Sequence, residues 1–337
     1  MNWCCRDAQG TIETMTTPTR AAAPAPETAP PARAALTAAA MVTTVVLWAS
    51  AFVGVRAVGH DLDAGALTLG RVAVGSLALT VILLVARARR GTPVRLPRGR
   101  ILLLVLAWGV AWFGAYNLTL NAAEQHLDAG TTALLVNIAP MLVAVLAGLV
   151  LREGFPRRLL VGIAIAFTGV VVIAVATTTG RFDAAGVALG LASAVLYAGA
   201  ATLQKRLLPR LDALTMTWLG CLAGTVAALP FLPALVSQAA AAPTSSLLGV
   251  VYLGVFPTAI AFTTWGYTLA RVTAGRAAAT TYAVPPLVVL MSWLLLDEVP
   301  APIVLLGGVL ALAGVAVATL PRHRPVRASA RHPVRTS

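Results

Sequence analysis

Apolar runs of about 20 residues dominate this chain, and a helix of that length crosses a hydrocarbon core of about 30 Å. The sequence contains ten of them. Their approximate bounds are 36–56, 64–86, 101–120, 128–151, 156–176, 183–204, 212–232, 246–270, 274–296 and 301–320. Membrane-spanning barrels need alternating segments of about ten residues, whereas these runs are continuous. The sequence therefore predicts an all-α membrane protein with ten transmembrane helices.

The composition agrees with a membrane protein. Of the 337 residues, 58% are hydrophobic and 11% are charged, and the mean hydropathy is +0.85, outside the usual balance of soluble domains. Little sequence lies between the apolar runs, so no soluble catalytic domain is expected. Residues 1–35 are rich in Pro and Ala and predict a disordered cytoplasmic tail. Residues 321–337 predict a basic cytoplasmic tail.

The basic residues are distributed unevenly between the two sides of the predicted helices. With a cytoplasmic N-terminus, 22 of the 25 Lys and Arg residues lie in the tails and in the loops on that side, all but Arg56, Arg71 and Arg181. This is the positive-inside pattern, and it predicts that both termini are cytoplasmic. It also argues against a nucleic-acid-binding role for the tail segment RHRPVRASARHPVR. Contact of that tail with anionic membrane lipid stays open.

An internal repeat relates the two halves of the chain at a spacing of 145 residues without a gap. The matched pairs are Gly130 with Gly275, Pro140 with Pro285, Glu153 with Glu298, Gly162 with Gly307, and Gly169 with Gly314. The repeat units cover residues 36–176 and 183–320, and each contains five predicted helices. An odd number reverses the direction in which the second unit enters the membrane. We therefore predict two inverted five-helix repeats, which suit alternating access around a site near the midplane.

The sequence resembles the EamA-type drug/metabolite transporter superfamily. Four segments carry the resemblance: LWASAFVGVR, Arg71 in LTLGRVAVGSLAL, AGTTALLVNIAPMLVAVLAGLVLREGFPRRLLVGIAIAFTGVVV, and AGRAAATTYAVPPLVVLMSWLLLDEVPAPIVLLGGVLALAGVAV. The resemblance implies ten helices in two tandem units and a secondary transporter. It also implies a substrate site enclosed by helices one, three, four, six, eight and nine. The family covers many substrates, so it names none.

Three residues within the predicted helices are candidates for a gating or structural role. Pro140 and Pro285 are expected to break the fourth and ninth helices at matching depths, and they either line the transport pathway or form packing kinks. Arg71 is the ionisable residue that lies well inside a predicted helix. It needs a partner or a water-filled cavity, or it extends to the outer membrane surface.

Glu153 and Glu298 allow two interpretations. Acidic residues near membrane helices can act as proton relays. Each of these, however, stands a few residues before a proline that can occupy the first turn of the next helix, where a carboxylate is stabilised by the helix dipole. We therefore predict that both glutamates stabilise the start of the helix that follows.

The candidate substrate-binding residues are polar or aromatic and lie at membrane depth. They are Trp48, Asn117, Asn137, Tyr197, Trp265 and Tyr282. Asn137 and Tyr282 occupy equivalent repeat positions three residues before Pro140 and Pro285, next to backbone groups freed by the breaks. Amides and aromatic rings suit a flat or amphipathic solute. The alternative for each residue is packing between helices.

The predicted function is a secondary transporter that exports small metabolites, amino acids or drug-like compounds across the cell membrane. A channel and an intramembrane enzyme are the alternatives, and the enzyme would need a cluster of reactive groups that the sequence does not indicate. The chain has no G-x-x-x-x-G-K-[ST] motif and one lysine, Lys205, so it is not expected to hydrolyse ATP. No cofactor, metal or nucleic-acid partner is predicted. Abundant Ala and Arg are consistent with a GC-rich bacterial genome.

Overall fold

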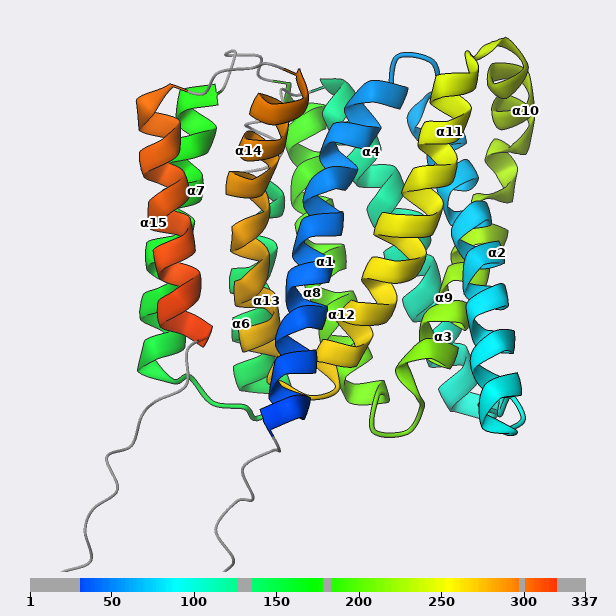
Figure 1. Cartoon of the computed structure of the whole chain (residues 1–337), viewed down its shortest axis with the longest axis horizontal. Helices are drawn as coiled ribbons and strands as arrows, with labels where there is room; N and C mark the ends of the chain where they lie inside the picture. The colour runs from blue at the N-terminus through cyan, green and yellow to red at the C-terminus, as the bar shows by residue number, and fades with distance from the viewer. Residues whose placement is uncertain (1–30, 127–134, 178–182, 297–300, 320–337) are drawn as a thin grey trace, which may run out of the picture.

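A computed structural model describes residues 31–126, 135–177, 183–296 and 301–319 of the chain (Figure 1). These residues form helices and connecting loops, with no strand among them, which confirms the all-helical prediction. Six of the described helices are long and apolar enough to cross a membrane. They are Arg33–Val58, Ala64–Arg90, Gly99–His126, Ala184–Leu207, Ala213–Ala241 and Thr244–Leu269. Ala139–Val150 and Pro302–Ala318 are shorter apolar helices.

The first half of the described chain contains seven helical elements. They are α1 (Pro31–Val58), α2 (Ala64–Arg90), α3 (Gly99–Gly109), η1 (Val110–Tyr116), α4 (Asn117–His126), α6 (Ala139–Val150) and α7 (Arg157–Thr177). The second half contains eleven. They are α8 (Ala184–Leu207), α9 (Ala213–Ala228), η2 (Leu229–Phe231), α10 (Leu232–Ala241), α11 (Thr244–Leu253), η3 (Gly254–Ile260), α12 (Ala261–Leu269), α13 (Ala274–Thr280), η4 (Thr281–Ala283), α14 (Val284–Leu296) and α15 (Pro302–Thr319).

Local sequence explains where α2 begins and ends. Asp63 precedes the helix in an extended conformation, and its side chain accepts a hydrogen bond from the Ala66 N–H at 2.7 Å. Gly91 ends the helix with a φ of 60°, a left-handed conformation that glycine adopts without steric penalty. Three arginines in the last turn, Arg87, Arg89 and Arg90, complement the negative end of the helix dipole. The basic segment that follows α2 thus starts from a capped helix end.

Two π-helical segments, η1 and η3, interrupt otherwise continuous helices at matching positions. η1 covers residues 110–116 between α3 and α4, and η3 covers 254–260 between α11 and α12, so the two coincide in the 145-residue register to within one residue. π-Helical turns are rare and are frequent at functional sites. The interruption at η3 has a local cause, because Pro257 lacks the N–H that an α-helix would require at that position.

The breaks predicted at Pro140 and Pro285 take the form of new helix starts. Pro140 lies in the first turn of α6, directly after a turn at residues 137–138. Pro285 is the second residue of α14 and follows the 3-10 segment η4. A proline is favourable in a first turn because its missing N–H would have no partner within the helix. Both prolines therefore mark interruptions of the helical path.

Glycines allow α7 and α15 to pack with their backbones in contact. A Cβ atom at Gly314 would lie 2.6 Å from the Gly162 carbonyl oxygen, and one at Gly169 would lie 2.5 Å from the Gly307 carbonyl oxygen. The two helices run side by side in opposite directions (Figure 1). A second close approach joins Gly109 to Gly220, where an added Cβ would lie 2.3 Å from the Gly220 carbonyl oxygen. Small residues at such contacts are typical of packed membrane helices.

Glu153 stabilises a helix start, but not that of the helix that follows it. Its carboxylate accepts hydrogen bonds from the Ala274 N–H at 3.0 Å and the Gly275 N–H at 3.4 Å, at the first turn of α13. The prediction that Glu153 stabilises the start of the helix after it was therefore wrong. Gly154, with its φ of 74°, turns the chain between Glu153 and α7. Glu298 lies outside the described residues.

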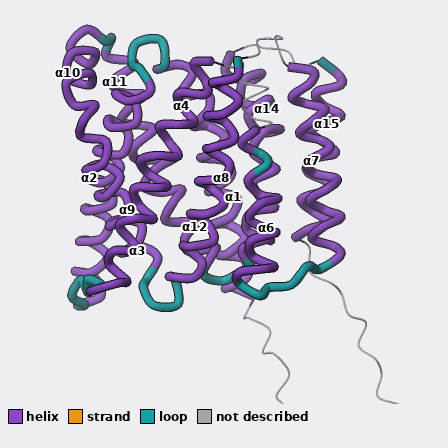
Figure 2. The backbone as a smooth tube through the Cα atoms, turned by 180° about the vertical axis from the view of Figure 1, so that it is seen from behind, coloured by secondary structure: helices purple, strands orange, loops and turns teal. Residues whose placement is uncertain are grey.

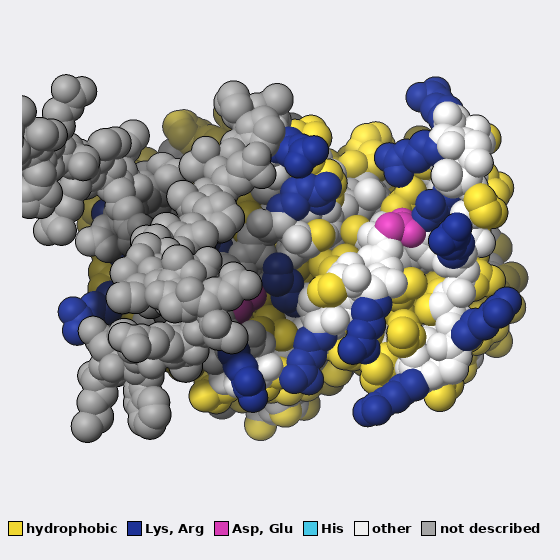
Figure 3. Space-filling view, turned by 90° about the horizontal axis from the view of Figure 1, so that it is seen from below, with side chains coloured by type: hydrophobic (Ala, Val, Ile, Leu, Met, Phe, Trp, Pro, Cys, Tyr) yellow, Lys and Arg dark blue, Asp and Glu magenta, His cyan; other side chains and the backbone are white. Residues whose placement is uncertain are grey.

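Many Lys and Arg side chains lie on the end of the molecule seen in Figure 3. The start of α1 and the end of α15 lie at this same end, as do the loops that connect α2 to α3 and α8 to α9 (Figures 1 and 2). Lys205 and Arg206 in the last turn of α8 and the three arginines of α2 contribute to it. The described chain therefore has a basic face on the side of its termini.

Candidate functional site

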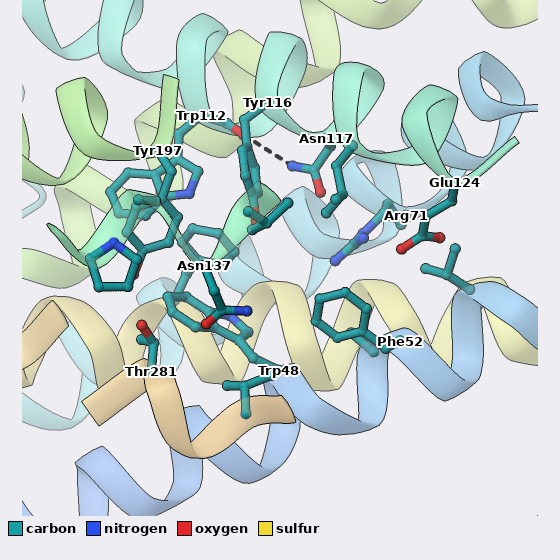
Figure 4. A pocket seen from close by; sticks show the side chains of 18 residues that line it. Trp48, Phe52, Arg71, Trp112, Tyr116, Asn117, Glu124, Asn137, Tyr197 and Thr281 are labelled. Carbon is teal, nitrogen blue, oxygen red and sulfur yellow. Dashed lines mark hydrogen bonds between the residues drawn. The ribbon is translucent and has the colours of Figure 1, made fainter. Parts of the chain in front are cut away.

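A cavity with a volume of about 80 Å³ lies inside the bundle (Figure 4). Residues from both halves of the chain line it, from α1, α2, η1, α4, the segment directly before α6, α6, α8, α12, η4 and α14. They are Trp48, Ala51, Phe52, Val55, Arg71, Trp112, Tyr116, Asn117, Leu120, Glu124, Val136, Asn137, Ala139, Pro140, Tyr197, Phe262, Thr281 and Val284. Pockets for drug-sized ligands measure roughly 300–1,000 Å³. The cavity is smaller than that, so these helices must separate before a drug-sized solute can bind.

Aromatic rings form one end of the cavity. The Trp48 and Phe262 ring centroids lie 5.4 Å apart, and the Trp112 ring lies 5.4 Å from both Tyr197 and Phe262. The Tyr116 ring lies 5.9 Å from Tyr197. All four pairs are edge-to-face or tilted, the arrangements that ring quadrupoles favour. This end of the cavity offers an apolar surface to a ligand.

Asn117 stabilises the backbone of the π-helical segment η1. Its side-chain amide donates hydrogen bonds to the carbonyl oxygens of Trp112 at 3.0 Å and Phe113 at 3.1 Å. Carbonyls freed by an irregular helix in a membrane need such partners because lipid supplies none. The bond to Trp112 is visible beside the cavity (Figure 4). The side-chain N–H groups of Asn117 are therefore committed to its own helix, and its amide oxygen is left for other partners.

Arg71 is held by the second interrupted helix. It is 5% exposed, and its Nε and Nη2 atoms lie 3.4 Å from the Thr258 hydroxyl oxygen. Thr258 in turn donates to the Leu253 carbonyl at 2.8 Å, the carbonyl that would have bonded to the missing N–H of Pro257. The kink at Pro257 thereby orients a threonine, and that threonine orients the arginine at the cavity. Arg71 lines the cavity as one of the predicted gating or structural residues.

Glu124 lines the same polar end of the cavity as Arg71 (Figure 4). The third predicted span ends at residue 120, so Glu124 falls outside it. In the structure α4 continues to His126. A sequence signal was available, since Asn117, Asn121 and Glu124 follow the i, i+4, i+7 spacing of one helix face. Sequence reasoning also did not single out Phe52, Phe262 and Thr281.

Four of the six predicted substrate-binding residues line the cavity together, namely Trp48, Asn117, Asn137 and Tyr197. Trp265 and Tyr282 do not line it in this conformation. Trp265 packs directly behind Trp48, with ring centroids 5.2 Å apart, and its indole N–H donates to the Gln204 side-chain oxygen at 2.9 Å. Pro140 lines the cavity, and Pro285 does not.

Tyr282 is fully buried in a different place. It packs between α6, α7 and α15, against a cluster that includes Ala144, Leu159, Ile163 and Ala311. Its hydroxyl has no hydrogen-bond partner among the described residues. Asn137 and Tyr282 are equivalent in the repeat, yet the structure places them in different environments.

The fold and the cavity define a multi-pass helical membrane protein. The EamA-like transporter family matches residues 35–175 and 184–320, so the chain contains two EamA units and belongs to this family. A solved crystal structure of a protein has the same fold, with a TM-score of 0.68 and 20% identity, covering 85% of this chain and 97% of that chain.

Three relatives illustrate the family. A probable terminal-alkyne amino-acid exporter of Streptantibioticus cattleyicolor is 38% identical, over 82% of this chain and 91% of the relative. An uncharacterized transporter of Bacillus subtilis is 32% identical, over 80% and 86%. A probable amino-acid metabolite efflux pump of Salmonella typhimurium is 27% identical, over 80% and 90%. Transport is the activity that their names share.

Proposed function

We propose that this protein is a secondary transporter that exports small metabolites, amino acids or drug-like compounds across the cell membrane by alternating access. The observation that carries the proposal is the cavity, because residues of both EamA units line it beside the interrupted helices. The names of an amino-acid exporter and an efflux pump among the relatives support the direction of transport. We further propose that Trp48, Asn117, Asn137 and Tyr197 contact the substrate.

We propose that ten helices cross the membrane as two inverted five-helix units. The glycine contacts between α7 and α15 support this arrangement. The repeat register relates Gly162 to Gly307 and Gly169 to Gly314, and the observed contacts join Gly162 to Gly314 and Gly169 to Gly307. Exchanging the two units therefore leaves this set of contacts unchanged, as a two-fold axis in the membrane plane requires.

We propose that both termini are cytoplasmic, because the basic face lies on their side. In a variant whose Cys4, Cys5 and Cys221 are replaced by serine, we expect Arg90→Cys to react with an impermeant thiol reagent only from the cytoplasmic side and Gln125→Cys only from outside. Both positions are exposed. Labelling of intact cells and of inverted vesicles measures this, and reaction of both cysteines from one side would disprove the arrangement.

The transport proposal is tested in two steps. Metabolites retained by a deletion strain and released by an overexpressing strain identify candidate substrates. Purified protein in liposomes loaded with such a solute should then exchange it for labelled solute outside, at a rate that saturates with concentration. A channel would give a far larger flux without counterflow exchange. If no solute that changes in the cells is moved by the liposomes, the transport proposal is wrong.

A further inference from the structure

We propose that a second cavity binds the phosphate group of an anionic membrane phospholipid. This cavity has a volume of about 200 Å³ and lies between α6, α7, α13 and α15. It is at the end of the bundle where α6 connects to α7 and where the described chain begins and ends (Figures 1 and 2). No described residue lines both this cavity and the central one. The proposal therefore concerns a separate site and does not depend on the transported solute.

The lining supplies hydrogen-bond donors for a phosphate from both EamA units. Arg158 is in the first turn of α7, in the first unit, and Arg276 is in the first turn of α13, in the second. Guanidinium groups bind phosphate oxygens with paired, charge-assisted hydrogen bonds. The Thr273 hydroxyl also lines the cavity. It accepts a hydrogen bond from the Arg276 backbone N–H at 3.4 Å, and its O–H group can donate to a phosphate oxygen.

The charge of the lining favours an anion. Glu153 is the acidic side chain among the described residues that line the cavity, and its carboxylate accepts hydrogen bonds from the N–H groups of Ala274 and Gly275. These bonds hold the carboxylate at the start of α13. Two arginines and one glutamate leave the described lining with a net positive charge. Basic pockets between helices on the cytoplasmic side of membrane proteins are typical binding sites of anionic lipid head groups.

Apolar surface next to the arginines suits a lipid better than a soluble anion. Buried Leu159 and the last-turn residue Val317 of α15 line the cavity beside the charged groups. Val317 is 38% exposed, and Val309 and Leu306 on the same face of α15 are 67% and 61% exposed. This face leads from the cavity toward the middle of the helix. A phospholipid whose phosphate lies at the arginines would place its acyl chains along it.

Charge argues against the C-terminal segment of this chain as the occupant. Residues 321–337 follow α15 in the sequence, and they contain five arginines and no acidic residue. A basic segment is repelled by a lining of net positive charge, whereas an anionic lipid is attracted to it. With the proposed orientation, the lipid would belong to the cytoplasmic leaflet, because the cavity is on the side of the termini.

Two phospholipids with the same acyl chains test the proposal. Palmitoyl-oleoyl phosphatidylglycerol is anionic, whereas palmitoyl-oleoyl phosphatidylcholine has a phosphate group but no net charge. We expect the purified, full-length protein in detergent to bind phosphatidylglycerol about 5- to 25-fold more tightly, because each arginine near an anionic lipid contributes a factor of about five. Native mass spectrometry during a lipid titration measures this ratio. Glycerol 3-phosphate, added as a competitor, tests whether a soluble phosphate takes the same site.

Substitutions locate the lipid on the protein. Arg158→Gln and Arg276→Gln should each lower the preference for phosphatidylglycerol about five-fold, because each removes one of the two cations at the phosphate. Arg89→Gln is the matched control. It removes the same charge from the same end of the bundle, but from the exposed end of α2, which lies at the opposite edge from α15 (Figures 1 and 2). It should leave the preference unchanged.

Three outcomes would overturn the proposal. One is equal binding of both phospholipids to the wild-type protein. Another is a preference that falls no more in Arg158→Gln and Arg276→Gln than in Arg89→Gln, which would place the lipid elsewhere on the basic face. The third is displacement of phosphatidylglycerol by an equal concentration of glycerol 3-phosphate, which would indicate a site for soluble anions.

The result does not depend on any one variant. If Arg276→Gln does not fold, Arg158→Gln decides, because the Arg158 side chain is exposed and its substitution removes no buried contact. The wild-type ratio requires no substitution. Lipid binding is measured without transport, so failure of counterflow contradicts the transport proposal and not the lipid site.

Discussion

Tyr282→Ala should destabilise the protein strongly without changing the apparent affinity of the protein that remains folded. The ring is fully buried between α6, α7 and α15, away from the cavity. Truncation of a large buried aromatic residue costs about 3–5 kcal/mol in soluble cores, and part of that value comes from the cavity left behind. We expect about 2–4 kcal/mol here, because transfer from water contributes less to packing within a membrane. Thermal unfolding in detergent and saturation of transport measure the two effects.

Two variants separate a packing role from substrate contact. Tyr282→Phe keeps the ring and removes a hydroxyl without a partner among the described residues, so stability should stay the same or rise. Asn137→Ala, at the repeat-equivalent position that does line the cavity, should fold normally and weaken the apparent affinity. A normal melting temperature with altered selectivity in Tyr282→Ala would instead place Tyr282 in the substrate pathway.

Gly314→Ala should also destabilise the fold, although it adds a single methyl group. That methyl group would lie 2.3 Å from the backbone nitrogen of Ala166 and 2.6 Å from the Gly162 carbonyl oxygen. Backbone atoms cannot rotate away as a side chain can, so α7 and α15 must separate along their contact. Overpacking of this kind costs about 1–3 kcal/mol, and we expect the upper part of this range. The melting temperature of the purified protein measures the loss.

The same substitution at Gly199 is the matched control. Gly199 is exposed on α8, and no atom lies within 4 Å of the position that its Cβ would occupy. Alanine favours a helix over glycine by up to about 1 kcal/mol, so Gly199→Ala should leave stability unchanged or raise it. If both variants lose stability equally, or if Gly314→Ala loses none, α7 and α15 do not pack as closely as the structure indicates.

Arg71 shows how the two units share the site. It belongs to α2 of the first unit, and its hydrogen-bond partner Thr258 belongs to the interrupted helix of the second. Movement of one unit against the other would therefore change the position of the guanidinium in the cavity. We expect this contact to contribute to the gating or structural role that the sequence predicts for Arg71.

The sequence alone determined that the protein is helical, that it belongs in a membrane, and which family it resembles. Backbone groups in lipid must bond within their own segment, so continuous apolar runs of about 20 residues have one regular solution. The interruptions at Pro140 and Pro285 were also predictable, because proline lacks the N–H donor of a continuing helix. The 145-residue register needed no structure either, since it depends only on residue identity.

The tertiary structure decided which side of each helix faces the cavity. That choice depends on how helices rotate and approach one another. The close contact between Gly109 and Gly220, for example, brings α3 against α9, a helix of the other half of the chain. Asn137 and Tyr282 match in the repeat but lie in different surroundings, because their neighbours on other helices differ. Glu124 lines the cavity because α4 extends to His126, and Glu153 accepts a hydrogen bond from Ala274, 121 residues away. Contacts between distant segments have no signature in local sequence.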